Sequence, residues 1–368
     1  MTAAHPPLRL PEAVIALVRH HWYDAAASML AVRAATPQPG DDRSRIDRAG
    51  QLAIAAKRVL DLDAEDFGPI AAGFHQPWAA SLAAARFPLG PREANRGALG
   101  SLVPLYELML EVVQHRSARQ ESLQVVVTAH LIGEYLGHLA WEGTLGHAGD
   151  PARMRASTDG LWGTDDPACP HNSAQRATAK RSLNACDGDV AGYTAYLDRF
   201  HSRLGDALSV CAMNHDTVEA GERPDVGETC PSPCGFALRR GLAHRRHLDA
   251  RVRLAKIYQD SRIVALRHHA PVGHFFGVPS VAEISEAWLH TWDKLTQQWP
   301  DGSNPLLAPD APRVAVPDEA LPGLSALVSA VADRPIGPGH VIEDIGADVI
   351  AVFDEPGGAP AARSGQVL

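Results

Sequence analysis

Residues 121–145 read ESLQVVVTAHLIGEYLGHLAWEGTL, and this stretch decides the fold class. It is long enough for about seven helical turns, and it contains no proline. Apolar residues occur on nearly every side of the helix that it predicts. Such a helix must be covered by neighbours all round. The stretch therefore predicts a helical core in which other helices surround residues 121–145.

Helical spacing of apolar residues recurs along most of the chain before Trp299. The pattern predicts a mostly α protein, built as a helical bundle without internal repeats. Residues 150–170 are rich in Gly, Asp, Pro and Thr and are expected to form a loop. The further helices are expected at 11–32, 45–60, 95–113 with a kink or interruption at Pro104, 187–213, 235–258 and 281–298.

The composition changes beyond Trp299, where Pro, Asp, Gly and Ala dominate. A short helix at 324–331 and a strand-like run at 348–353 are the elements expected there. We therefore expect residues 1–299 to form a helical catalytic domain. Residues 300–368 are expected to form an irregular, Pro/Gly-rich C-terminal appendage outside the chemistry.

Charge and composition limit the partners. With 34 Lys and Arg against 43 Asp and Glu, the net charge is -9, which argues against a general grip on nucleic-acid phosphates. The N-terminus lacks the pattern of a signal peptide, and no apolar run reaches the length of a membrane span. A small-molecule or protein partner, no membrane contact and a cytoplasmic location are expected.

The five cysteines form an odd set in a large chain, so reduced thiols are expected rather than a disulfide framework. Cys230 and Cys234 flank Pro-Ser-Pro and invite comparison with a structural zinc site. Such a site needs a second pair of ligands, which Cys169 and His171 could supply from a distance. Simple thiols in a connecting loop are the preferred interpretation.

The segment RHHAPVGHFFG, residues 267–277, concentrates three histidines beside apolar and aromatic side chains. A buried imidazole needs a partner for each ring nitrogen, and an iron atom is one such partner. Phe275 and Phe276 would help to supply the apolar slot that a porphyrin requires. The alternative is a satisfied core histidine with two surface histidines.

A second group of ionisable residues lies within the apolar helix. His130, Glu134, His138 and Glu142 follow one another at intervals of four, so they form a slowly drifting polar stripe. Four such groups on a buried face are costly unless they are paired or coordinated. The stripe therefore indicates either a site or simple His–Glu pairing along a groove or subunit contact.

These two stretches resemble the tryptophan 2,3-dioxygenase superfamily. TAHLIGEYLGHLAWE is similar to its distal helix, in which a histidine followed four residues later by glutamate lies over the haem face. RHHAPVGHFFG is similar to its proximal segment. The resemblance is closer to the histidine-ligated tyrosine and 3-methyltyrosine hydroxylases of natural-product pathways, whose proximal run has the form His-x-x-x-Cys-Gly-His-Phe-x-Gly. It covers about 25 residues with precision.

The resemblance implies that His268 ligates the iron of a haem. The cysteine that forms a thioether bond to haem in some relatives is Val272 here, so a non-covalent haem b is expected. His130 then becomes the distal acid or base, and Glu134 would orient it or anchor the helix. Paired subunits are common in that superfamily, so a homodimer is compatible with the resemblance.

The leading hypothesis is a haem-dependent monooxygenase or peroxygenase. It would hydroxylate tyrosine or a tyrosine derivative to a catechol, using dioxygen or hydrogen peroxide. An aromatic amino acid also needs a partner for its carboxylate, for which arginine is well suited. Arg199 and Arg203, between the two haem motifs, are the candidates for this role.

Three alternatives stay open. A tryptophan or indole oxygenase would use the same haem motifs. A non-haem diiron oxidase could use Glu111/His115, Glu134/His138 and Glu286/His290, although the usual diiron spacing is three residues rather than four. In a non-catalytic helical interaction protein, the histidines would only pair with carboxylates.

Overall fold

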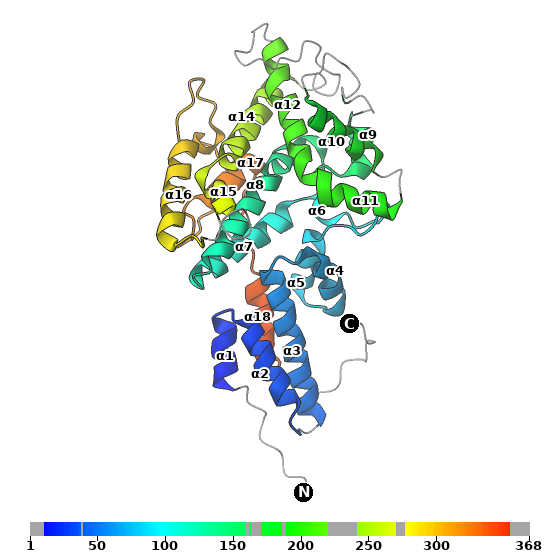
Figure 1. Cartoon of the computed structure of the whole chain (residues 1–368), viewed down its shortest axis with the longest axis vertical. Coiled ribbons are helices and arrows are strands. Elements are labelled where there is room, and N and C mark those ends of the chain that lie inside the picture. The colour runs from blue at the N-terminus through cyan, green and yellow to red at the C-terminus, as the bar shows by residue number, and fades with distance from the viewer. Residues whose placement is uncertain are drawn as a thin grey trace. The chain divides into compact units, whose positions relative to one another are not determined.

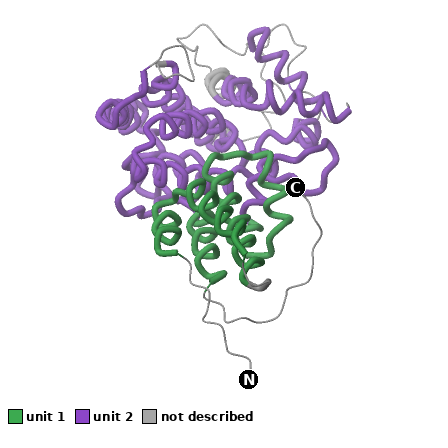
Figure 2. The backbone as a smooth tube through the Cα atoms, turned by 60° about the horizontal axis from the view of Figure 1, so that its bottom comes forward, with its two compact units in different colours: residues 1–80, 340–368 green, residues 81–339 purple. Residues whose placement is uncertain are grey.

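The computed structural model describes residues 11–37, 40–158, 162, 171–185, 189–219, 241–269 and 277–353. The described residues are mostly helical and include no strand, which confirms the expected mostly α class (Figure 1). None of their helices is both long and apolar enough to cross a membrane. The chain groups into two compact units, Met1–Ala80 with His340–Leu368 and Ser81–Gly339 (Figure 2).

Unit 1 is a helical cluster around α3. It contains α1 (Glu12–Arg19), α2 (Tyr23–Ala34), α3 (Gly40–Leu60), α4 (Ala64–Gly73), the start of α5 (Pro77–Ala85) and α18 (Val341–Ala351). The Tyr23 hydroxyl donates a hydrogen bond to the Ile342 carbonyl at 3.0 Å. This bond and the buried faces of α2, α3 and α18 join the N-terminal helices and α18 into one core.

Unit 2 is built around α8 (Ser122–Leu145), as the sequence predicts. The helices that pack against α8 come from before it and from after it in the sequence (Figure 1). They are α7 (Val103–Ala118), α12 (Ser202–Glu219), α14 (Leu242–Gln259), α15 (Arg262–Ala265), α16 (Val281–Leu295) and α17 (Leu324–Ala332). The remaining elements of the unit are α6 (Gly97–Gly100), α9 (Pro151–Thr158), α10 (Ser173–Asn184), α11 (Val190–Tyr196), the π-helical segment η1 (Leu197–His201) and the 3₁₀ segments η2 (Leu266–His269) and η3 (Pro305–Leu307).

Three local expectations need correction. The expected helix over 11–32 breaks at His20–Trp22, where His21 has a φ of 58°. The loop expected over 150–170 begins with α9, because Pro151 suits a first helical turn and Asp150 accepts a hydrogen bond from the Ala152 amide at 2.9 Å. The strand expected at 348–353 is helical from Asp348 to Ala351, at the end of α18.

The C-terminal residues 300–353 are not an appendage. The helix expected at 324–331 is present as α17, and its apolar side chains are buried in unit 2. Arg251 of α14 donates hydrogen bonds to the carbonyls of Ala140 and Val331, at 2.6 and 2.7 Å, and so connects α8 to α17. The compact units therefore do not follow the expected boundary at residue 299, because α17 and α18 each bury an apolar face.

Gly323 allows α17 to begin against the Trp292 indole. Its φ is 92°, and a Cβ added there would lie 2.2 Å from an indole carbon of Trp292. We expect Gly323→Ala to lower the free energy of unfolding by about 2–4 kcal/mol, because the substitution adds both backbone strain and overpacking. Urea unfolding followed by tryptophan fluorescence measures this change.

Gly143→Ala is the matched control for this prediction. Gly143 lies inside α8, and an added Cβ would meet no atom within 4 Å. That substitution should be neutral or should stabilise the helix by about 0.5–1 kcal/mol. Equal stability of the two variants would contradict the assigned role of Gly323.

Candidate functional site

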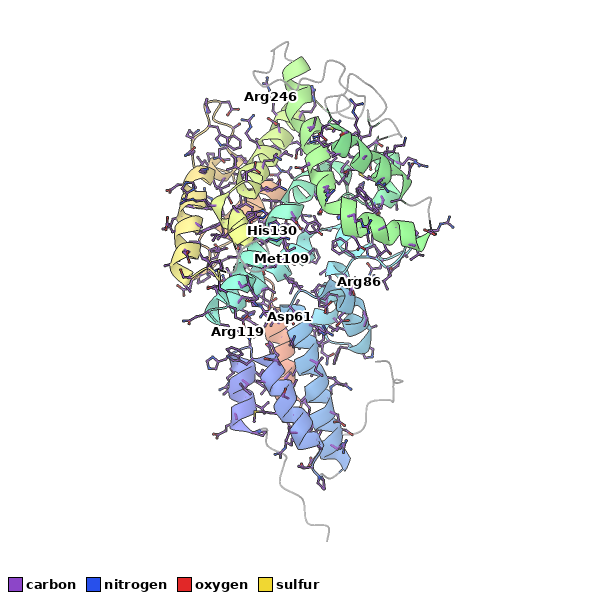
Figure 3. The ribbon with its side chains drawn as sticks, viewed as in Figure 1. Asp61, Arg86, Met109, Arg119, His130 and Arg246 are labelled. Carbon is purple, nitrogen blue, oxygen red and sulfur yellow. The ribbon has the colours of Figure 1, made fainter. Side chains whose placement is uncertain are left out.

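His130 and Glu134 lie one turn apart on α8. The His130 side chain is 13% exposed, and its Nε2 is 3.0 Å from Oε1 of Glu134. The other ring nitrogen, Nδ1, is buried and has no hydrogen-bond partner. Figure 3 labels His130 within unit 2. The expected distal pair is therefore brought into hydrogen-bonding contact by helical spacing alone.

The chain after α14 brings the Arg-His segment to the same part of α8. Tyr258, near the end of α14, donates a hydrogen bond to the Ala129 carbonyl at 2.9 Å. Tyr258 and Val264 also pack closely over Gly133 of α8. Because α15 is docked in this way, η2 follows directly beside α8. The two sequence motifs therefore meet in the folded chain.

His268 of η2 lies close to His130. Their ring centroids are 6.5 Å apart, and the ring planes are nearly perpendicular, at 78°. His268 itself is exposed. The structure thus brings together His130, Glu134 and His268, three residues that the sequence selected from two separate stretches.

Arg267 is a member of this group that the sequence reasoning did not assign to the site. Its guanidinium donates a hydrogen bond to Nε2 of His130, and Nη1 is 3.9 Å from Oε1 of Glu134. The hydrogen bond with His130 is the largest influence holding the pKa of Glu134 below its ordinary value, and the charges of His130 and Arg267 add to it. Burial opposes them. The position of Arg267 immediately before the expected ligand was the available sequence signal.

The other expected site residues do not join this group. Arg199 lies on η1 and Arg203 on α12, and both are exposed. In the part of the chain that the structure describes, neither forms a hydrogen bond or ion pair with His130, Glu134 or His268. Phe275, Phe276, Cys230 and Cys234 lie outside the described residues.

The second half of the polar stripe on α8 serves other purposes. Glu142 accepts hydrogen bonds from the Ser101 hydroxyl at 2.7 Å and from the Leu102 amide at 2.8 Å, and it also contacts Arg334. Leu102 is the N-cap residue of α7. Glu142 therefore holds the start of α7 against α8, which is a structural role.

His138 is fully buried and lies in a separate aromatic cluster. Its ring centroid is 4.6 Å from that of His201, and Tyr135 lies within 6 Å of both rings. Neither ring nitrogen of His138 makes a hydrogen bond of acceptable geometry, whereas Nε2 of His201 donates to the Ala148 carbonyl at 3.0 Å. The sequence reasoning did not select His201, whose neighbours along the chain are mostly polar or charged.

Burial controls the protonation of this histidine pair. It lowers the pKa of His138 well below the ordinary value, the charge of His201 acts in the same direction, and the backbone of His201 opposes both. Burial also lowers the pKa of His201 to about 4, against the opposing effects of the Ala148 carbonyl and Asp150. Both imidazoles are therefore neutral in the folded protein near neutral pH.

The three Glu–His pairs of the diiron alternative are not grouped. Glu111 and His115 are buried on α7 at 3.5 Å, and Glu286 is exposed and paired with Arg262. Glu134 contacts His130 rather than His138. Within the described ranges, no three side chains of His, Cys, Asp or Glu are arranged to hold a metal ion.

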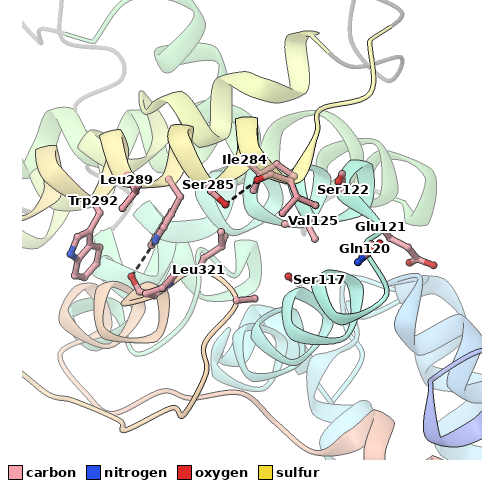
Figure 4. Close-up of a pocket in the computed structure, with 14 residues that line it drawn as sticks. Ser117, Gln120, Glu121, Ser122, Val125, Ile284, Ser285, Leu289, Trp292 and Leu321 are labelled. Carbon is pink, nitrogen blue, oxygen red and sulfur yellow. Dashed lines mark hydrogen bonds between the residues drawn. The ribbon is translucent and has the colours of Figure 1, made fainter.

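A cavity of about 350 Å³ lies elsewhere in unit 2, between α16, the α7–α8 turn and residues 320–322 (Figure 4). Trp288, Trp292, Leu289 and Ile284 supply much of its apolar lining. Within it, Nε1 of Trp288 donates to the Pro322 carbonyl at 3.1 Å. None of its lining residues belongs to the His130 group, so we place the candidate chemistry at His130, where the ionisable groups converge.

Comparison with protein-family models, with curated proteins and with solved structures found no match to this chain. The resemblance to haem-dependent oxygenases therefore rests on the residues of the two motifs. The candidate site is accordingly defined by its own geometry, namely His130, Glu134, Arg267 and His268.

The buried histidine pair predicts that unit 2 loses stability in acid. His201 has a pKa of about 4 when folded, against about 6.5 in an unfolded chain. Below about pH 6.5 the unfolded chain binds more protons, so the free energy of unfolding falls as the pH drops toward about 4. His201 alone should account for a loss on the order of 2–3 kcal/mol.

His201→Gln tests this assignment, because an amide cannot take up the proton. Urea unfolding between about pH 7 and about pH 4.5 should show a shallower loss of stability than in the wild type. His247→Gln, at an exposed position of the same unit, is the control. An unchanged pH dependence in His201→Gln would show that another group causes the acid sensitivity.

Proposed function

We propose that the protein is a haem-dependent oxygenase that hydroxylates an aromatic amino acid, with tyrosine or a tyrosine derivative converted to a catechol. The observation that carries the proposal is the meeting of His130 and His268, whose rings lie 6.5 Å apart although they come from two distant motifs. A haem pocket and a tryptophan-dioxygenase-like arrangement of the helices belong to this proposal. The two-motif resemblance supports it independently of the geometry.

The donor set suits haem iron. A neutral imidazole is a common axial ligand, and the exposed His268 is accessible on η2. Nδ1 of His130 is buried, so Nε2, which contacts Glu134 and Arg267, is the nitrogen that faces the site. Phe275 and Phe276 are the proposed apolar contacts of the porphyrin. Non-covalent haem b is proposed because Val272 replaces the cysteine of some relatives.

Haem, when bound, would supply the activation of dioxygen or hydrogen peroxide. The residues of the chain would hold the substrate and move protons. Nε2 of His130 is the atom proposed to take a proton from the substrate phenol. Glu134 lies 3.0 Å from that nitrogen and would orient the ring by accepting a hydrogen bond from Nε2 once the proton has been transferred. Arg199 and Arg203 stay proposals for the substrate carboxylate, with the structural finding that both are exposed.

A tryptophan or indole oxygenase is the second candidate, because the same His130–His268 meeting would serve an indole N–H as well as a phenol. The diiron oxidase has less support, because its three Glu–His pairs are dispersed among the described helices. A non-catalytic interaction protein predicts that the chain purifies colourless when iron and a haem precursor are supplied.

Reconstitution with hemin tests the proposed function. The wild type should bind hemin with a strong Soret band, and its spectrum should shift on addition of tyrosine, 3-methyltyrosine or tryptophan, which separates the substrate alternatives. His268→Ala should abolish or strongly change the Soret band, because the axial imidazole is lost. His130→Ala should retain haem but reduce turnover by about 10²–10⁴-fold.

His247→Ala is the matched control, because this histidine is exposed and lies outside the site. A wild type that stays colourless under these conditions would contradict haem binding. An unchanged spectrum in His268→Ala would contradict the ligand assignment, and full turnover in His130→Ala would remove its proton-transfer role.

A further inference from the structure

The Arg267 guanidinium lies over the nitrogen of His130 that faces the candidate site. It donates a hydrogen bond to Nε2. Because Nδ1 is buried, Nε2 is the ring nitrogen that an incoming molecule would need to reach. The Arg267 side chain is 37% exposed and the His130 side chain 13% exposed. The covering group is therefore the more solvent-accessible of the two.

The same nitrogen has two incompatible partners. A guanidinium only donates hydrogen bonds and a carboxylate only accepts them. Nε2 of His130 must therefore be unprotonated to accept from Arg267, and protonated to donate to Oε1 of Glu134 at 3.0 Å. A neutral imidazole cannot satisfy both. One of the two contacts is thus held less firmly than a dedicated hydrogen bond. The Arg267–Glu134 ion pair is long, at 3.9 Å, and its side chains are 37% and 33% exposed.

We infer that Arg267 is a movable guard residue, which covers Nε2 of His130 and must leave it before a ligand can reach that atom. The Arg267 side chain is long and 37% exposed, so withdrawal into solvent is the movement that the guard role requires. The identity of the ligand that takes the place of Arg267 rests on the proposed function. In that function, haem binds first and the aromatic substrate follows.

Chemical footprinting tests the guard role without any cofactor. Diethyl pyrocarbonate acylates unprotonated imidazole nitrogens, and mass spectrometry gives the rate for each histidine. In the wild type, diethyl pyrocarbonate should modify His130 more slowly than the exposed His247. Arg267→Ala should accelerate modification of His130 by about threefold to tenfold, the range expected for loss of one partly exposed, charge-assisted contact.

Three variants sharpen this experiment. Arg267→Lys retains the charge but loses the planar fork, so an intermediate rate is expected. Glu134→Gln removes the carboxylate that competes with Arg267 for Nε2 of His130, so modification of His130 should stay as slow as in the wild type. Arg267→Lys provides the second route if Arg267→Ala folds poorly. Arg262→Ala is the matched control, because Arg262 is an exposed arginine of the same segment and pairs with Glu286 instead.

Hemin association connects the guard role to the proposed function. In stopped-flow measurements of the Soret band, Arg267→Ala should bind hemin about threefold to tenfold faster than the wild type. Arg262→Ala should bind at the wild-type rate.

The outcomes separate the two proposals. Unchanged modification of His130 in both Arg267→Ala and Arg267→Lys would overturn the guard role. Accelerated modification without hemin binding in any variant would uphold the guard role and overturn the proposed cofactor. Slower hemin association in Arg267→Ala would also overturn the guard role, because it would make Arg267 a residue that attracts the ligand.

Discussion

The burial of α8 is the constraint on which the rest of unit 2 depends. A helix of 24 residues with apolar side chains nearly all round gains stability only when neighbours cover every face. Helices from positions 103 to 332 supply that cover. Because α14 and α15 must dock on one face, η2 is carried to the His130 turn as a consequence of packing. The meeting of His130 and His268 thus follows from the hydrophobic core.

Local patterns predicted the elements of this core well. The α8 stretch has no proline before its cap, and Gly146 ends the helix in the left-handed conformation. The predictions failed where short-range signals compete with tertiary burial. Residues 348–353 are rich in β-branched and aromatic residues, as strands are. Yet Val341, Ile342, Ile345 and Val349 repeat at helical spacing and are buried together. Beyond Trp299 the helix at 324–331 was predicted, but the Pro- and Gly-rich composition around it gave no sign that its apolar side chains are buried in unit 2.

The candidate site was predictable only in part, for a geometrical reason. The His130–Glu134 contact is local and follows from helix periodicity. The contact of Arg267 with both depends on how α15 docks on α8, through the close packing of Val264 and Tyr258 over Gly133. No spacing rule in the sequence encodes such a tertiary contact. The same is true of the His138–His201 pair, whose members come from different helices.

The four polar groups of α8 also differ in how completely their hydrogen bonds are satisfied. Glu142 has three compatible donors and fixes the start of α7. His138 is fully buried, so it has no access to solvent or substrate. Neither of its ring nitrogens makes a hydrogen bond of acceptable geometry, which costs stability. Only at His130 do a donor and an acceptor compete for one partly exposed nitrogen. A contact that cannot satisfy all its members is readily exchanged for another, and ligand binding requires such an exchange.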